Sequence, residues 1–365
     1  MERKDNLDLL RCISILMVIV IHVSASHLIA NAPKMNTNFD IANFYDSISR
    51  TAVPLFVLLS GYFTLRKSKN LAMYFKKLTL GLIVPTIIWM VLYEFFEFID
   101  HGGWDAFVAF VGDGGLWGAF NNLFFHNFGR HLWFMPMFIG LQILAPLLIA
   151  VRNKIGELGF LLLGIFFLAF GILEAILSFS GTDMIVANIF NSFVYLGYFI
   201  LGYSLPNTIF SRLKKVIWLG LFVVSSVTIY LCTGWAVGNR TTISFKPLYF
   251  YDYLSIFVII AAISLFMLFT KIKIRNRALQ NVSRLITPHI FFIYFVHLIV
   301  LRYVTKFFAE MIPVENHLTW AIPVMSIIIF IISYLIAAIF GGIKGLFIRK
   351  KPSGFKMPES PIGGI

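Results

Sequence analysis

Long apolar windows recur along almost the whole sequence and constrain its fold more than any other feature. Each window can cross a hydrocarbon layer of about 30 Å as a helix that rises 1.5 Å per residue. Inside a bilayer, a segment of this length satisfies its backbone hydrogen bonds as a helix. The ten windows run at about 9–29, 48–65, 78–98, 132–150, 158–178, 186–205, 215–233, 250–270, 289–309 and 319–343. The sequence therefore predicts an all-α fold, a polytopic membrane helical bundle of about ten transmembrane helices.

The composition agrees with a membrane protein and excludes most soluble classes. Hydrophobic residues make up 59% of the chain and charged residues only 13%, which is far outside the balance of soluble globular proteins. The two cysteines, Cys12 and Cys232, are predicted near opposite membrane faces. They therefore offer neither a disulfide framework nor a cysteine metal site, and we expect no bound metal.

The basic residues predict the orientation of the bundle. A net charge of +13 would suggest a nucleic-acid partner in a soluble protein, but here the charges lie between apolar windows. They concentrate at the N-terminus, in the loops after the second, fourth, sixth and eighth windows, and at the C-terminus. The positive-inside rule makes that face cytoplasmic. We therefore predict that both termini are cytoplasmic and that nucleic acid is not a partner.

The windows and loops suggest one membrane domain with a tail. We assign residues 1–347 to the membrane domain and residues 348–365, rich in Pro, Gly and Lys, to a disordered cytoplasmic tail. The outside loops are predicted to be short except at about 30–47 and 99–131. The second of these is rich in Trp and Phe, so it can lie in the outer interface and roof a cavity.

Ionisable residues inside the first window are the strongest functional signal. Arg11 and His22 are eleven residues apart, which advances a helix by about 16 Å and brings it within about 20° of three full turns. They therefore share a face, and Asp8 lies one turn below Arg11 on the same stripe. Ionisable groups at this depth usually line a cavity or pair with a partner. Two simpler explanations remain open: Arg11 can snorkel to the headgroups, and His22 can be an interhelical hydrogen-bond partner.

Further segments match a family pattern together with the Arg-x10-His spacing of Arg11 and His22. They are residues 40–43, Ser49-Arg50, 53–56 and 60–62, residues 131–134 (His-Leu-Trp-Phe) with Pro146-Leu147, and residues 293–297 (Ile-Tyr-Phe-Val-His). In this order they resemble the motifs of the acyltransferase-3 family of bacterial integral membrane proteins. The similarity looks closest to the branch that contains the enterobacterial common antigen O-acetyltransferase.

The resemblance implies a membrane-bound O-acyltransferase of the bacterial cytoplasmic membrane. Such an enzyme transfers an acyl group, usually acetyl, from cytoplasmic acyl-CoA to a hydroxyl of an envelope polysaccharide or lipid-linked sugar. Arg11 would hold a CoA phosphate, with Asp8 either orienting or neutralising it. His22 would act as general base or accept the acyl group transiently.

The resemblance also assigns residues to the acceptor. We expect the substrate-binding residues to be Arg50, His131, Trp133, Tyr294 and His297. Arg50 can hold the substrate or stabilise an oxyanion, or else anchor its helix at the interface. His131 and Trp133 can shape a sugar platform or belong to an interfacial aromatic belt. The expected partners are acyl-CoA, acetyl-CoA above all, the glycan acceptor and membrane lipids, and a homo-oligomer is left open. Succinyl transfer fits the sequence nearly as well as acetyl transfer.

Two other functions fit the same sequence features. A transporter or exporter of a polysaccharide or its precursor would also have about ten helices with ionisable residues inside the membrane. A sensor that binds acyl-CoA without turnover is a third hypothesis. Cleavage of the thioester distinguishes the enzyme from both.

Overall fold

The computed structural model describes residues 4–66, 70–101, 103, 105, 108, 132–179, 187–240 and 247–348. Within these ranges the regular structure is helical, so the all-α prediction is confirmed. The predicted tail lies outside the described residues from position 349 onward. The α-helices are α1 (Asp5–Asn31), α2 (Thr37–Ser49), α3 (Ala52–Thr64), α4 (Leu71–Leu78), α5 (Val84–His101), α8 (Phe134–Phe179), α9 (Ala187–Ser204), α10 (Lys215–Gly238), α11 (Ile256–Lys271), α12 (Arg277–Ile286), α13 (Ile290–Met311) and α14 (Leu318–Ile348).

Short helices of other types connect or interrupt these elements. A π-helical turn joins α4 to α5. The other short elements are 3-10 helices, and three of them matter below: η5 (Tyr249–Tyr251), η6 (Thr287–His289) and η7 (Val314–Asn316).

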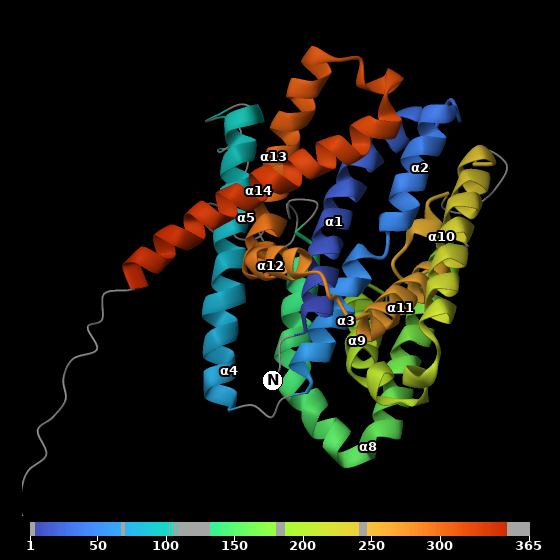
Figure 1. The fold of residues 1–365 in the computed structure, drawn as a ribbon, viewed down its shortest axis with the longest axis vertical. Helices are drawn as coiled ribbons and strands as arrows, with labels where there is room; N and C mark the ends of the chain where they lie inside the picture. The colour runs from blue at the N-terminus through green and yellow to red at the C-terminus, as the bar shows by residue number, and fades with distance from the viewer. Residues whose placement is uncertain are drawn as a thin grey trace, which may run out of the picture.

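Helix α1 is the centre of the bundle. It contacts α2, α3, α11, α12, α13 and α14, and Figure 1 shows it in the middle of the molecule with α4 and α5 on one side and α10 on the other. Its core-facing side chains include Leu7, Leu10, Ile15 and Ile19, which are fully buried. On the predicted polar stripe Asp8 is buried as well, and Arg11 and His22 are partly buried, so the stripe faces other helices.

Seven helices in the described part of the chain are long and apolar enough to cross a membrane. Two of the ten predicted windows, 132–150 and 158–178, fall within α8, which folds back at Gly156, where φ is +74°. Figure 1 shows this bend as a V at the end of the bundle where the N-terminus lies. Two more windows, 48–65 and 186–205, correspond to α3 and α9, which are not among the seven. The prediction of a bundle of several membrane-spanning helices is therefore confirmed.

The expected long loop at 30–47 is wrong. Residues Thr37–Ser49 form α2, capped by the Asn36 side chain, which accepts a hydrogen bond from the backbone N–H of Phe39. The expected window at 48–65 is instead the short helix α3, separated from α2 by a break at Arg50 and Thr51. The sequence of α2 mixes apolar and polar residues at helical spacing, a pattern that the search for long apolar windows does not detect.

Helices α3 and α9 pack unusually closely because glycines lie at their crossing. A Cβ atom on Gly61 would lie 1.8 Å from the carbonyl oxygen of Phe199, and one on Gly202 would lie 2.0 Å from that of Leu58. Small residues of this kind let backbones approach in membrane bundles. Neither position can therefore hold a larger residue without moving the two backbones apart, and the contact fixes the position of α3.

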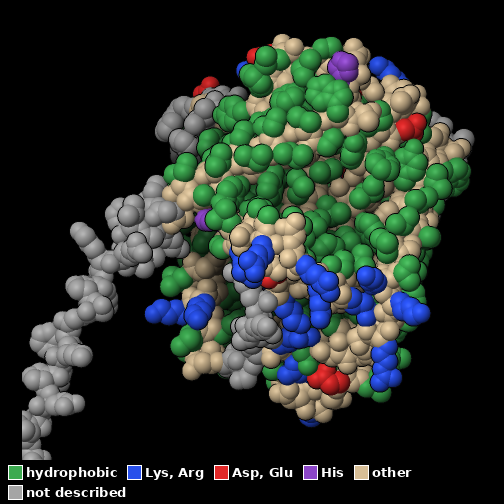
Figure 2. Space-filling view, in the orientation of Figure 1, with side chains coloured by type: hydrophobic (Ala, Val, Ile, Leu, Met, Phe, Trp, Pro, Cys, Tyr) green, Lys and Arg blue, Asp and Glu red, His purple; other side chains and the backbone are tan. Residues whose placement is uncertain are grey.

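Basic side chains gather at one end of the molecule. Figure 2 shows Lys and Arg concentrated around the end where the N-terminus and the bend of α8 lie, while the opposite part of this face is mainly hydrophobic. The exposed cations at this end include Arg212, Lys214, Lys215, Lys273 and Arg275. We call this end of the molecule the basic end.

Candidate functional site

Arg11 lies near the basic end of α1 and is held there by two contacts. Its Nη1 donates a hydrogen bond to Oδ1 of Asp8 at 3.3 Å, and its Cζ lies 4.2 Å from the centre of the Phe63 ring. The Asp8 side chain is only 7% exposed, whereas that of Arg11 is 28% exposed. Asp8 therefore both neutralises and orients Arg11. The guanidinium of Arg11 remains partly accessible to solvent.

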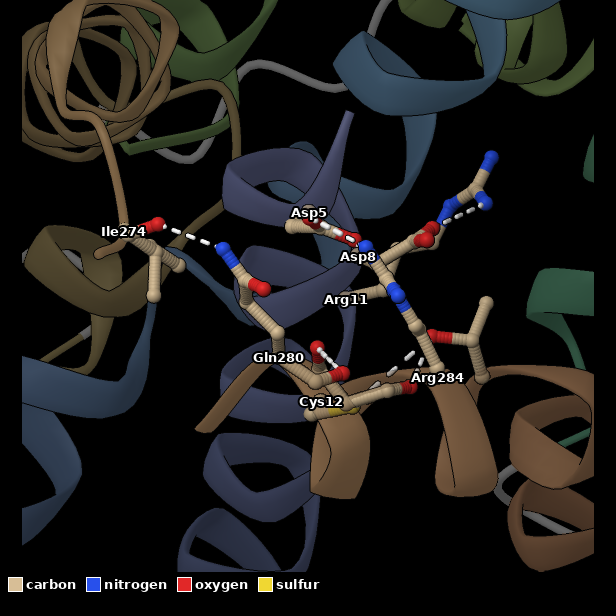
Figure 3. A network of polar contacts seen from close by, with 9 residues as sticks. Asp5, Asp8, Arg11, Cys12, Ile274, Gln280 and Arg284 are labelled. Carbon is tan, nitrogen blue, oxygen red and sulfur yellow. Dashed lines mark hydrogen bonds and ion pairs between the residues drawn. The ribbon is translucent and has the colours of Figure 1, made fainter. Parts of the chain in front are cut away.

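A polar network ties the start of α1 to α12 (Figure 3). Arg284 on α12 donates two hydrogen bonds of 2.7 Å to the carboxylate of Asp5. Beside this pair, Cys12 packs against the Ser283 carbonyl and the Thr287 hydroxyl. The network fixes η6 next to Arg11, so that α12 and η6 help to shape the surroundings of that residue.

A cavity opens beside Arg11. It has a volume of about 240 Å³, and its walls come from α1, α3, α8, η6 and α13. Its lining is mainly aromatic and apolar, with a few hydroxyl groups. The lining residues are Arg11, Phe56, Leu59, Ser60, Phe63, Thr64, Phe138, Thr287, Pro288, Ile290 and Phe291. The cavity can take an elongated, partly apolar ligand with an anionic end at Arg11.

His22 lies about 16 Å farther along α1 than Arg11, at 1.5 Å of rise per residue. Its ring centre is 5.3 Å from that of His297 on α13. No hydrogen bond joins His22 to another residue in the described part of the chain. The imidazole of His22 therefore keeps its nitrogens available for a substrate.

The tautomer of His297 follows from its backbone contact. Its Nδ1 lies 2.6 Å from the carbonyl oxygen of Tyr294, and a carbonyl can only accept a hydrogen bond. The proton of a neutral ring must then be on Nδ1, so Nε2 is the proton acceptor. The His297 side chain is fully buried, and its orientation is fixed by this bond.

Arg50 lies in the break between α2 and α3 and forms a closely held ion pair. Its Nε and Nη2 lie 2.6 and 3.0 Å from the two carboxylate oxygens of Asp46, which is fully buried. Its Cζ lies 4.2 Å from the centre of the Tyr251 ring, and Tyr251 donates a hydrogen bond to Asn43. The positive charge of Arg50 is close enough to act on the imidazole of His22.

Trp133 stands at the start of α8 with one face against other aromatic rings. Its ring is stacked on Tyr253 at 5.9 Å and also contacts Tyr195 and Phe134. Tyr253 in turn lies within the electrostatic reach of Arg50. The Trp133 side chain is 39% exposed, so part of this rigid ring is accessible to a ligand.

The structure brings most of the predicted acceptor residues together with His22. Tyr294 contacts both His297 and Phe134 at ring distances of 5.8 and 5.7 Å, and the Phe134 ring contacts Trp133. We call this group the histidine site, and it consists of His22, Arg50, Trp133, Tyr294 and His297. His131, the remaining predicted acceptor residue, lies outside the described residues.

Three phenylalanines separate the histidine site from the cavity at Arg11. Phe56 and Phe138 line the cavity, and both contact Phe134, with ring distances of 6.4 and 5.2 Å. Phe134 contacts Tyr294 on the other side. We call Phe56, Phe134 and Phe138 the aromatic partition. Arg11 thus lines the cavity with Asp8 bound to it, and the contacts of the aromatic partition lead from the cavity to Tyr294 of the histidine site.

The sequence analysis missed several residues of the histidine site and of the cavity beside Arg11. Asp46 was overlooked because α2 was expected to be a loop, although Asp46 and Arg50 have the i, i+4 spacing of a helical ion pair. Tyr251 and Tyr253 reach Arg50 only through tertiary packing, and no local pattern marks them. The aromatic partition was hidden among the 40 phenylalanines of the chain.

The histidine site, buried within a multi-pass helical bundle, has the side chains that a membrane-embedded group-transfer enzyme requires. Comparison with protein families agrees with this class, because the acyltransferase domain of the acyltransferase-3 family matches residues 4–339. The chain belongs to the acyltransferase-3 family and is an acyl-transferring enzyme. Comparisons with curated proteins and with solved structures gave no significant match. Family membership supports the enzyme hypothesis over the transporter hypothesis.

Proposed function

We propose that this enzyme transfers an acetyl group, or another short acyl group, from acyl-CoA to a hydroxyl of an envelope polysaccharide or lipid-linked sugar. The observation that carries the proposal is the pair of histidines, His22 and His297, within a polar and aromatic site deep in the bundle. An imidazole near a hydroxyl acceptor is suited to proton transfer at neutral pH. The finer resemblance to the enterobacterial common antigen O-acetyltransferase branch supports a glycan acceptor.

The proposed topology has ten crossings in the bacterial cytoplasmic membrane, with both termini inside. The positive-inside rule supports it, because the basic end contains the N-terminus and the bend of α8. In this arrangement α3 and α9 complete the set of crossings, and the two arms of α8 count separately. The donor then enters at the basic end and the acceptor at the opposite end.

At the histidine site we propose direct transfer with His22 as general base. The acceptor oxygen attacks the thioester carbonyl carbon while its proton passes to His22, and the carbon–sulfur bond breaks to release the CoA thiolate. The proton on His22 can then return to the thiolate. Nε2 of His297, whose tautomer is fixed by the Tyr294 carbonyl, can accept or relay that proton.

A two-step reaction uses the same residues and remains the alternative. His22 would attack the thioester itself, and the acylated imidazole would then be attacked by the acceptor hydroxyl. In both reactions negative charge develops on the carbonyl oxygen. Arg50 acts electrostatically on His22, and its ion pair with Asp46 fixes it in position. A fixed cation stabilises such a charge without reorganisation.

The donor route in this proposal is the cavity beside Arg11. Its mainly aromatic and apolar lining can hold the pantetheine arm, and the rise of about 16 Å between Arg11 and His22 matches an extended arm. The aromatic partition must open for the thioester to pass. Trp133 on the far side offers an accessible ring face on which a sugar can stack.

The test uses purified protein with radiolabelled acetyl-CoA and a glycan acceptor. His22→Ala should abolish label transfer while expression and thermal stability stay near normal. His317→Ala is the matched control. His317 is an exposed residue in the connection between α13 and α14, so its substitution should leave transfer unchanged. Substantial transfer by the His22 variant would remove that residue from the chemistry. Glycan flux without thioester cleavage would instead support the transporter hypothesis.

A further inference from the structure

Two basic residues at the basic end of the molecule gather on one buried tyrosine. Tyr62, near the end of α3, is only 2% exposed. Lys4 Nζ donates a hydrogen bond to the Tyr62 hydroxyl and lies 5.2 Å from the ring centre, while Arg66 Cζ lies 3.9 Å from the same centre. Two like charges are thus held close together at one aromatic ring.

No carboxylate compensates these two charges within the described residues. Arg11, Arg50, Arg152 and Arg284 each have an acidic partner, whereas Lys4 and Arg66 have none there. Arg66 donates one hydrogen bond to the side-chain oxygen of Asn207 at 3.1 Å.

The Nε of Arg66 adds a second, independent observation. This atom is buried and has no hydrogen-bond partner in the described part of the chain. A buried donor of this kind costs free energy unless a ligand satisfies it. Together with the uncompensated charges, it indicates that an anionic group belongs at this position.

Arg152 makes this corner rigid. Its Nη1 donates a hydrogen bond of 2.7 Å to the carbonyl of Leu65, the residue before Arg66. Its own charge is shared with Glu157 and with the ring of Tyr203. The end of α3 is therefore fixed to the bend of α8, and Arg66 is presented on a rigid backbone.

The same helix forms one wall of the cavity described above. Ser60, Phe63 and Thr64 on α3 line the cavity, and Arg66 follows Thr64 by two residues. Because two residues advance a helix by about 200°, Arg66 lies on another face of α3 than these three residues. A ligand whose apolar arm occupies the cavity must therefore bend around the end of α3 to bring its anionic end to Arg66 and Lys4. Arg11 lies on the cavity wall itself, so it contacts a different part of such a ligand.

We propose that Lys4 and Arg66, assembled on Tyr62, form a binding site for a phosphate ester. Guanidinium groups bind phosphate oxygens through paired, charge-assisted hydrogen bonds, and Nε of Arg66 gains its partner in this way. The phosphate is that of the nucleotide end of the acyl donor, an assignment that rests on the proposed function. The headgroup of an anionic phospholipid has the same chemistry, and the experiment separates the two sources.

The experiment measures binding to the full chain in nanodiscs and requires no turnover. Coenzyme A is titrated calorimetrically in phosphatidylcholine nanodiscs for wild type, Lys4→Gln, Arg66→Gln and Arg66→Lys. Arg212→Gln is the matched control, because Arg212 is an exposed cation of the same end. In parallel, native mass spectrometry counts the phosphatidylglycerol that each variant retains from mixed-lipid nanodiscs.

We expect coenzyme A affinity to fall about tenfold in Lys4→Gln and in Arg66→Gln, to recover partly in Arg66→Lys, and to stay within about twofold in Arg212→Gln. Pantetheine, which has no phosphate, should bind wild type and Arg66→Gln equally. Loss of retained phosphatidylglycerol with unchanged coenzyme A affinity would support the phosphate site and identify lipid as its source. Unchanged binding of both probes in correctly folded variants would overturn the proposal. A failure of acyl transfer would leave these binding results intact.

Discussion

The crossing of α3 and α9 allows a sharp test of how the fold positions the cavity. In Gly61→Ala the new Cβ would lie 1.8 Å from the Phe199 carbonyl oxygen and 2.7 Å from its carbon. Both atoms are backbone, so neither can rotate away as a side chain could. Because ordinary contacts begin near 3.4 Å, the two helices must separate by roughly 1.5 Å at this point.

The magnitude follows from two opposing effects. Overpacking a closely packed interface costs about 1–3 kcal/mol, and this contact is at the severe end of that range. Replacing glycine by alanine inside a helix gains about 1 kcal/mol. We expect Gly61→Ala to lower the free energy of unfolding by about 2 kcal/mol. It should also raise KM for the acyl donor, because Leu59, Ser60 and Phe63 move with α3.

Thermal unfolding in detergent and donor kinetics measure these effects. Gly140→Ala on α8 is the matched control, because a Cβ there meets nothing within 4 Å. The control should be neutral or stabilising by up to about 1 kcal/mol. Equal melting temperatures for the two variants would refute the close approach of α3 and α9.

Three further predictions concern the site and its surroundings. Asp46→Asn should lower stability by about 3 kcal/mol, because it leaves the buried Arg50 charge uncompensated, and should reduce kcat more than donor KM; an unchanged kcat would separate Arg50 from the chemistry. Phe138→Ala should widen the aromatic partition and raise kcat/KM for butyryl-CoA relative to acetyl-CoA about tenfold; an unchanged ratio would argue against this route. Partial burial raises the pKa of Glu315, but hydrogen bonds from His27, Asn31 and Asn38 outweigh it and hold this pKa below its usual value. Its stabilisation, about 0.5 kcal/mol after solvent screening, is therefore present at pH 7 and lost as pH falls below about 4.3. The melting-temperature difference between wild type and Glu315→Gln should shrink over that range, and a constant difference would contradict the assignment.

The first helix could be predicted in most of its detail from local information. The 3.6-residue period places Asp8, Arg11 and His22 on one stripe, and the Arg11–Asp8 contact confirms the lower part of it. Hydropathy likewise predicts the multi-pass bundle, because lipid-facing and buried surfaces are both apolar. These features depend on spacing within one segment.

Features that depend on tertiary packing could not be predicted in this way. The sequence contains no local sign that His297 lies against His22, since 275 positions separate them in the chain and only the packing of α1 on α13 brings them together. Helix α2, and with it the break before α3, was missed because α2 contains no long apolar window. The break is stabilised by the Asp46 pair and by the ring of Tyr251.

The transfer of an acyl group across the membrane is tested most directly by the sidedness of donor use. Protein is reconstituted in sealed vesicles of uniform, verified orientation, with labelled acetyl-CoA on one side and the glycan acceptor on the other. We predict label transfer when acetyl-CoA meets the basic end, where the N-terminus and the start of α1 lie, and none when the two substrates exchange sides. Equal rates in both arrangements would contradict transfer across the membrane.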